Sequence, residues 1–402
     1  IFGAGIYALI GEAAATAGNG LWLSFALAAI IASFTGLSYA ELSSMYPDAG
    51  AEYEYTKRPF GRRLGFIVGW LVIASAVISS ATVALGFGGY FVKLFGGEIV
   101  YAGIGLIAAL TFLLIWGIKQ SAWIACIFTL IEASGLFIII AIGMPHFGSV
   151  NYLELPLGFG GVFVASALIF FAFLGFEDMV KMAEEVKKPE KTVPRALIIA
   201  MILAAIVYIL VAVSAVSVLG WEKLAASPAP LAYVAAVSFG SSAFVLLSMI
   251  ALFATANTIL MMMLAGSRII YDMAKDRMFP AVFSLVSKNR RTPVYATIAI
   301  AVLCALFVLF RDISLVANLT NFTVFVTFIL INATVIILRR RNPKAKRPFK
   351  SPSIGPVPVM AWMGLFTTAF LALNLDMTAV SLGIVVVAAG LIFYHFICGK
   401  SR

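Results

Sequence analysis

The feature that most constrains this chain is a succession of apolar stretches long enough to cross a lipid bilayer as helices, which takes about 20 residues each. Hydrophobic residues make up 62% of the 402 residues and charged residues only 11%, whereas a typical soluble domain has about 25% charged residues. A soluble fold could not cover so much apolar surface, and membrane-spanning strands would be shorter and would alternate in polarity. The sequence therefore predicts an all-α integral membrane protein with about 12 transmembrane helices.

The predicted spans are residues 1–17, 21–45, 64–92, 100–117, 121–144, 161–182, 193–219, 241–274, 294–310, 313–338, 357–375 and 377–397. Because the chain begins at Ile1, inside an apolar run, we expect the first span to be truncated on its N-terminal side.

The positions of the basic residues predict the orientation of the chain. Successive loops alternate between the two sides of the membrane, and lysine and arginine gather in the loops that face the cytoplasm. With these spans, all of the 28 Lys and Arg residues except Lys93, Lys223 and Arg311 fall on one side. We therefore expect a multi-pass plasma membrane protein with both termini in the cytoplasm. The net charge of +10 follows from this topology and from contact with anionic lipid, so we expect no nucleic-acid partner.

Motifs for catalysis are missing from the sequence. It has no HExxH zinc motif, no GxSxG nucleophile turn and no phosphate-binding P-loop. Two histidines are too few for a His-based metal site, and no ring of charges indicates a channel filter. The sequence therefore favours a carrier over an enzyme or a channel, with no catalytic residue, no metal and no cofactor.

Two glycine-containing clusters lie inside predicted spans. Gly3-Ala4-Gly5 lies in the first span, and residues 171–177, with Gly175, lie in the middle of the sixth. Each is either a surface for close helix packing or an interruption of the helix. An interruption exposes amides that suit a carboxylate and carbonyls that suit an ammonium group. Because spans one and six run in opposite directions, paired interruptions there are typical of a transporter site between two inverted halves.

Four blocks of sequence resemble the amino acid–polyamine–organocation (APC) superfamily. The most specific block reads FFAFLGFE at 170–177, AEEVKKP at 183–189 and PRA at 194–196. The others are GAGI at 3–6 with GEAA at 11–14, LSYAEL at 37–42 with YPDAGAEY at 46–53, and AGSR at 265–268 with MAKD at 273–276. The resemblance covers essentially the whole chain, which is therefore similar to an amino acid permease.

The resemblance implies an inverted five-plus-five helical fold, followed by two peripheral helices, in one membrane domain. Residues 1–145 would form the first repeat, 150–338 the second, and 355–398 spans eleven and twelve. The substrate carboxylate would meet the amides of Ala4, Gly5 and Ile6, and its amine the carbonyls of Ile1, Phe171 and Leu174. Polar residues of the eighth span, such as Asn257 and Thr258, are candidates to bind substrate or a cation. The expected substrate site comprises Ile1, Gly3, Ala4, Gly5, Ile6, Phe171, Phe173, Leu174, Gly175 and Asn257.

Acidic residues at membrane depth call for a reason, because each costs a few kcal/mol to insert. Glu132 lies halfway along the fifth span. It is either a protonation site or counter-ion, or a structural carboxyl hydrogen-bonded to neighbouring helices. Glu177 follows the sixth-span interruption and either caps the freed amides or couples substrate to proton. For the acids beside basic loops, Glu41, Glu184 and Glu185, we expect ion pairs at the cytoplasmic face.

The predicted function is a secondary active transporter that moves amino acids by alternating access, with proton coupling or exchange. Neither interruption carries a further unpaired acid for a cationic side chain, which favours neutral amino acids. The alternative is a polyamine or other amine carrier of the same fold. The tenth span is polar for its depth, with Asn321 among its residues, which is typical of the wall of a water-filled pathway. The expected partners are the amino acid, a proton or other coupling ion, and membrane lipid.

Overall fold

The computed structural model describes residues 3–47, 51–181, 183, 186–287 and 292–398. Within these residues, nine helical stretches are long and apolar enough to cross a membrane. One of them, Ala4–Met45, contains two helices joined by a 3₁₀ turn. Two shorter apolar helices, Val294–Val308 and Val359–Ala372, lie where the ninth and eleventh spans are predicted. Each predicted span therefore has a helical counterpart, and the prediction of an all-α membrane fold is confirmed.

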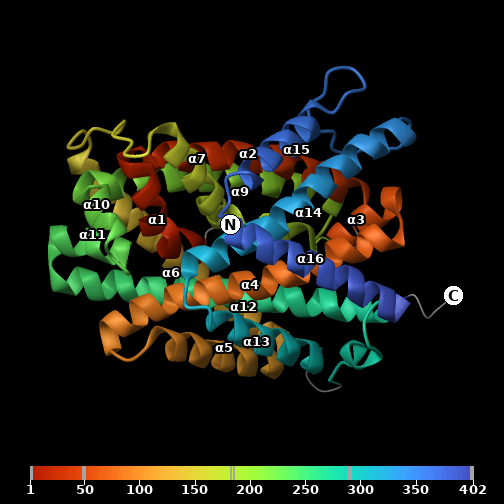
Figure 1. Ribbon diagram of the computed structural model, residues 1–402, viewed down its shortest axis with the longest axis horizontal. Helices are drawn as coiled ribbons and strands as arrows, with labels where there is room; N and C mark the ends of the chain where they lie inside the picture. The colour runs from red at the N-terminus through yellow and green to blue at the C-terminus, as the bar shows by residue number, and fades with distance from the viewer. Residues whose placement is uncertain (1–2, 48–50, 182, 184–185, 288–291, 399–402) are drawn as a thin grey trace.

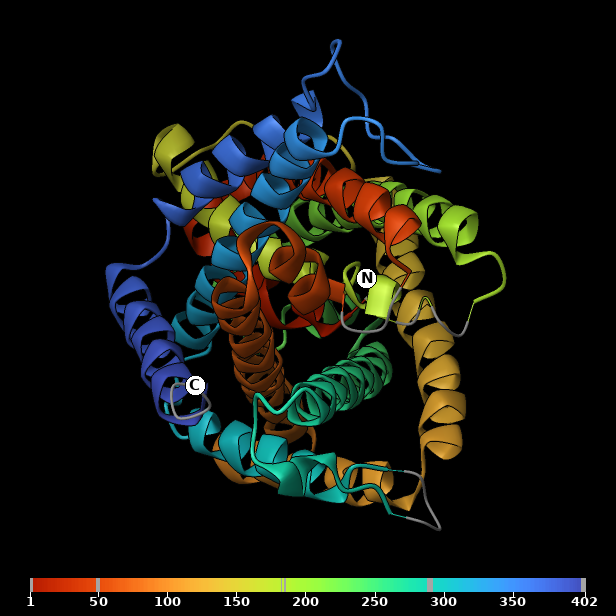
Figure 2. The ribbon, with the colours of Figure 1, turned by 90° about the vertical axis from the view of Figure 1, so that its right-hand side faces the viewer.

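The segments that match the predicted spans form one bundle, shown across its long axis in Figure 1 and along that axis in Figure 2. They are α1 (Ala4–Ala17), α2 (Leu21–Met45), α4 (Arg62–Phe95), α5 (Ile99–Trp116), α6 (Ile118–Gly143), α7 (Gly158–Ile169) with η3 (Phe170–Phe173) and α8 (Asp178–Lys181), α9 (Pro189–Leu219), α12 (Ser241–Lys275), α13 (Val294–Val308), α14 (Ile313–Arg341), α15 (Val359–Ala372) and α16 (Met377–Cys398).

Three further helices, which the sequence does not predict, lie outside these spans. The first is α3 (Ala51–Phe60), at the end of the bundle where α14 and α16 also end, on the right of Figure 1. We call this the basic end, because α14 finishes there with Arg339, Arg340 and Arg341. The other two, α10 (Trp221–Ala225) and α11 (Pro230–Phe239), lie at the opposite end.

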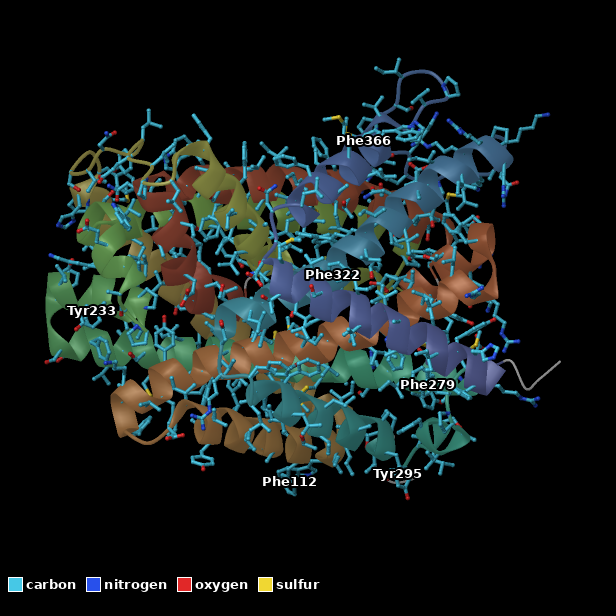
Figure 3. The ribbon with its side chains drawn as sticks, viewed as in Figure 1. Phe112, Tyr233, Phe279, Tyr295, Phe322 and Phe366 are labelled. Atoms are coloured by element: carbon cyan, nitrogen blue, oxygen red, sulfur yellow. The ribbon has the colours of Figure 1, made fainter. Side chains whose placement is uncertain are left out.

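The bundle has a protein-covered centre and a lipid-facing rim. In the 18-residue apolar stretch of α4, 72% is buried inside the bundle, whereas in that of α16 only 17% is buried. Large apolar side chains on rim helices, such as Phe112, Tyr295 and Phe366, are exposed and point away from the bundle (Figure 3). Such side chains would be a liability in water, and in a membrane they contact lipid.

The central helices pack in a regular pattern. α1 packs against α7, α2 against α9, α4 against α12, and α5 against α13. In terms of the predicted spans, these pairs are one and six, two and seven, three and eight, and four and nine. The first four helices of the first predicted repeat therefore each contact their counterpart in the second. The division into two inverted repeats stays a prediction, and this pairing supports it.

Helix α3 is held to the basic end by polar side chains. The Tyr53 hydroxyl donates to Asp276 Oδ2 at 3.1 Å, and Lys57 Nζ lies 2.9 Å from Glu54 Oε1 and 3.4 Å from Asp276 Oδ2. Burial, opposed by Lys57 and reinforced by the Asp276 carboxylate, raises the pKa of Tyr53 to about 12. Tyr53 is therefore a neutral hydrogen-bond donor near pH 7, and α3 is fastened to the end of α12.

A buried ion pair joins α2 to α14 at the same end. Glu41 and Arg339 expose only 1% and 5% of their side chains, and the guanidinium donates to both carboxylate oxygens through Nε, at 2.9 Å, and Nη2. Ser351 adds its backbone N–H at 2.9 Å and its hydroxyl at 2.7 Å, and Arg347 Nε lies 3.3 Å from Glu41 Oε1. The ion pair predicted for Glu41 is therefore present, and it also anchors the segment that precedes α15.

We expect Arg339→Met to lower the free energy of unfolding by about 3–5 kcal/mol, because it leaves the buried Glu41 carboxylate without its main partner. The measurement is denaturant-induced unfolding of the purified protein in detergent. Arg340→Met is the matched control, because Arg340 is adjacent but exposed. Equal unfolding midpoints for the two variants would contradict a stabilising role for the pair.

Candidate functional site

The first glycine cluster lies at the start of α1, and Gly3 is the first residue that the structure describes. Gly3 has extended backbone angles, φ −159° and ψ 177°, and α1 begins near the middle of the long axis (Figure 1). The first amides of a helix have no partner within the helix, and Gly3 has no side chain that could cap them. The Ala4 N–H is instead satisfied from α12, because it donates to Thr258 Oγ1 at 2.9 Å.

The second interruption divides the sixth predicted span. α7 ends at Ile169 and is followed by the 3₁₀ turn η3, by Leu174 in an extended conformation, and by Gly175 at φ +104°. Helical structure resumes only at Asp178. The positive φ at Gly175 lies in a region that glycine adopts without strain, so a residue visible in the sequence accounts for this turn.

Two side chains satisfy the backbone groups that this interruption frees. Glu177 Oε2 accepts the N–H of Gly175 at 2.9 Å. Asn321, which is fully buried on α14, donates through Nδ2 to the carbonyls of Ala167 at 2.7 Å and Leu168 at 3.0 Å. The last turn of α7 is therefore held by a helix that is about 150 residues away in the chain.

The start of α1 lies against the interruption of the sixth span. A Cβ atom added at Gly5 would lie 2.6 Å from the Cα of Ala172 in η3, which is closer than side chains allow. Gly5 therefore lets the first turn of α1 approach the interrupted part of the sixth span. This is the packing role that the sequence leaves open for the first glycine cluster.

A cavity of about 380 Å³ borders the start of α1 and the interrupted sixth span. Gly3 lines it on the side of α1, Leu174 and Gly175 line it on the side of the sixth span, and Asn257 and Thr258 line it from α12. The volume falls within the range of about 300–1,000 Å³ that is typical of small-molecule sites. The interruptions therefore have room for a small ligand beside them.

The rest of the cavity wall is mainly apolar. Met179, Met261 and Met262 contribute flexible thioether side chains, and Leu203 adds an aliphatic one from the first half of α9. Methionine adapts its shape to what it contacts. Asp178 also lines the cavity, so the wall includes one carboxylate near the second interruption.

A buried carboxyl and a buried amide lie beside this cavity. Glu132 on α6 is 0% exposed, and its Oε2 lies 3.5 Å from Asn257 Nδ2, which also donates to Thr129 Oγ1 at 3.1 Å. Among the residues that the structure describes, Glu132 Oε1 and Asn257 Oδ1 have no hydrogen-bond partner. Buried acceptors without donors are uncommon. A proton on Glu132 would supply a donor in this cluster.

Comparison with known proteins identifies the family. The model of the amino acid permease family matches residues 1–395. The chain belongs to the amino acid permease family. It is therefore a multi-pass membrane transporter and not an enzyme, and the predicted resemblance to the APC superfamily is confirmed.

Curated relatives of this permease differ in what their names say they carry. The permease is 30% identical to the branched-chain amino acid permease of Bacillus subtilis, over the whole of this chain and 90% of that protein. It is 28% identical to the methylthioribose transporter of Bacillus subtilis, over 90% of this chain and 83% of that protein. It is 31% identical to the vacuolar cationic amino acid transporter 4 of Arabidopsis thaliana, over 85% of this chain and 61% of that protein.

The predicted substrate residues of the permease fall into groups according to whether they line the cavity. Gly3, Leu174, Gly175 and Asn257 line the cavity. A second group is buried within the bundle and is absent from the cavity lining; it comprises Ala4, Gly5, Ile6, Phe171 and Phe173. Ile1 lies outside the described part of the chain. The substrate roles of all these residues stay predictions. Glu184 and Glu185, for which ion pairs are predicted, also lie outside the described residues.

Three polar contacts refine the sequence-based interpretation of the permease. Glu177 caps an amide, as one of its two predicted roles requires, but the amide belongs to Gly175 and not to the inner half-helix. Asn321 is 0% exposed and bonds to α7 carbonyls, so this side chain holds α7, and the tenth span as the wall of a water-filled pathway stays a prediction. Thr258 holds the Ala4 amide. In the sequence, these three residues are marked only by being polar within an apolar span.

We expect Gly175→Ala to cost about 1–3 kcal/mol of stability, because the added Cβ strains a backbone at positive φ, and to reduce transport. Thermal unfolding in detergent and uptake into proteoliposomes measure the two effects. Gly105→Ala on α5 is the control, because a Cβ there would meet nothing within 4 Å. A Gly175→Ala variant that matched Gly105→Ala in both assays would contradict the importance of the turn.

Proposed function

We propose that this permease is a secondary transporter of neutral amino acids that works by alternating access across the plasma membrane. The observation that carries the proposal is that the start of α1 and the interrupted sixth span border one cavity of about 380 Å³. Interrupted helices with their dipole ends at a midplane cavity are the structural basis of substrate binding in many carriers. The basic end would face the cytoplasm, following the distribution of Lys and Arg.

The substrate would bind through its backbone groups. Its carboxylate would approach the amides at the beginning of α1, where the helix dipole favours an anion. Its ammonium group would approach carbonyls of the sixth-span interruption and the unpaired Oδ1 of Asn257. The methionines and Leu203 of the wall would surround an apolar side chain. This mode needs no charged protein side chain to neutralise a zwitterion.

The coupling ion in this proposal is a proton carried by Glu132. Its burial and the absence of a partner for Oε1 among the described residues favour the neutral, protonated form of the carboxyl. Asn257 connects it to the cavity, because this side chain both lines the cavity and lies 3.5 Å from Glu132 Oε2. A change at the cavity that moves Asn257 would therefore change the environment of Glu132.

A second candidate function is transport of a cationic amino acid or another amine. The observation that favours it is Asp178, whose carboxylate lines the same cavity. A carboxylate beside the cavity would attract a second positive charge on the substrate. The two candidates differ in the charge of the side chain that the cavity accepts.

The experiment that tests the function is counterflow into proteoliposomes with purified protein and radiolabelled leucine, alanine, arginine or putrescine. We expect saturable accumulation of leucine or alanine, and little of the two cations, because most of the cavity wall is apolar. Accumulation of only arginine or putrescine would support the second candidate. A non-saturating conductance, or no accumulation of any of the four, would contradict both.

Replacing Glu132 tests the coupling. Glu132→Gln keeps the shape of the side chain and cannot release a proton, so we expect it to abolish substrate-driven proton uptake while amino acid exchange continues. A pH-sensitive dye inside the proteoliposomes measures proton uptake. Glu98→Gln is the control, because Glu98 is an exposed acid beside Arg311. Proton uptake that is missing from the wild type, or unchanged in Glu132→Gln, would refute the proton-carrier role.

A further inference from the structure

The hydroxyl of Thr258 links α12 to the first turn of α1. It donates to the carbonyl of Ala254 at 3.0 Å, one turn earlier in its own helix, a common local bond for threonine. Because the hydroxyl proton is used within α12, its oxygen is left to accept from outside the helix. It accepts the N–H of Ala4 at 2.9 Å. The first amide of α1 is therefore held by a neutral hydroxyl.

This contact lies at the cavity. Thr258, Gly3 and Asn257 all line it. Asn257 is only 5% exposed, and its Oδ1 has no donor among the described residues. The cavity is thus bordered by Asn257, whose Oδ1 atom lacks a donor in the described part of the chain, and lies beside the Ala4 amide, whose acceptor is only a neutral hydroxyl. Both groups match an incoming zwitterion, which brings an ammonium donor and a carboxylate acceptor.

The two possible acceptors for the Ala4 amide differ in strength. A hydrogen bond to a carboxylate is about twice as strong as one between neutral groups. The helix dipole adds to the attraction for the anion. A substrate carboxylate would therefore displace the Thr258 hydroxyl. In the empty carrier, however, the hydroxyl keeps the amide from being unsatisfied at membrane depth, which would be unfavourable.

We propose that Thr258 is a positioning residue that occupies the Ala4 amide in the empty permease and competes with the substrate carboxylate for it. This role rests on the proposed function, and it adds a determinant of apparent affinity that the predicted site does not include. The competition lowers the affinity for amino acids and stabilises the empty carrier. A step that moves the empty site across the membrane, as net uptake requires, depends on that stabilisation.

Thr258→Val tests this role, because valine has nearly the shape of threonine and lacks the hydroxyl. We expect the KM for leucine to fall on the order of tenfold, because the empty variant leaves the Ala4 amide without an acceptor, and a buried donor without a partner costs about that much. Net leucine uptake should become slower than leucine–leucine exchange. Net uptake requires the empty carrier to reorient, and in the empty variant the Ala4 amide has lost the Thr258 hydroxyl that accepts its hydrogen bond. Inhibition of uptake by 3-methylbutylamine, which is leucine without its carboxylate, should not strengthen.

Two variants serve as controls. Thr258→Ser keeps the hydroxyl and should behave as the wild type. Thr255→Val removes a fully buried hydroxyl on the same helix that bonds only to carbonyls of α12, so it reports the loss of a hydroxyl without loss of the contact to α1. If Thr258→Val does not fold, Thr258→Ala removes the same contact and should lower KM in the same way.

The outcomes separate this role from the proposed function. Saturable leucine uptake with an unchanged KM in Thr258→Val would overturn the competition. A raised KM would also overturn it, and would make the hydroxyl a direct ligand of the substrate. Absence of saturable uptake in the wild type and all variants alike would contradict the proposed function and this role together.

Discussion

Every backbone amide and carbonyl at membrane depth must find a partner, because lipid offers none. An unbroken helix meets this requirement within itself, whereas in this permease the sixth predicted span is interrupted next to the start of α1. Three side chains take over the missing bonds: Thr258 for the Ala4 amide, Glu177 for the Gly175 amide, and Asn321 for the last carbonyls of α7. Thr258 and Gly175, which take part in two of these contacts, line the cavity. The geometry of the candidate site therefore depends on side chains outside the interrupted segments as much as on the glycines within them.

The spans could be predicted from the sequence because lipid imposes one simple rule of length and polarity. The sequence does not predict α3, α10 and α11, because short helices at the ends of a bundle need no fixed length or polarity. The interruptions could be located, since Gly3 and Gly175 mark positions where the backbone leaves the helix. Their partners could not be located. Ala4 and Thr258 are 254 residues apart, and no local pattern tells which polar residue of a distant helix will meet a freed amide.

The carboxyl groups of Glu41 and Glu132 are both buried, but their surroundings give them different roles. Glu41 receives donors from Arg339 and from the backbone and hydroxyl of Ser351, with Arg347 close by. It is fully satisfied, so a change in its protonation would break several bonds at once. Glu132 has one long contact with Asn257, and its second oxygen has no partner in the described structure. A group with unused hydrogen-bonding capacity can gain or lose a proton with little rearrangement. This difference explains why the first belongs to the architecture and the second to the proposed coupling.

The two ends of the bundle are also held by bonds of different strength, which bears on how the proposed cycle would open it. Opposite the basic end, Asn19 joins the end of α1 to Glu154 and to the Trp221 amide at the start of α10. A Cβ at Gly11 would lie 2.9 Å from the Leu224 carbonyl, so α10 also covers the side of α1. Glu154 is exposed, and water can replace its hydrogen bonds at little cost, about 1 kcal/mol each. The Glu41 pair has no such replacement. If the cavity is to reach that side of the membrane, the contacts around Asn19 can separate first, while the ion pair at the basic end keeps α2 and α14 together.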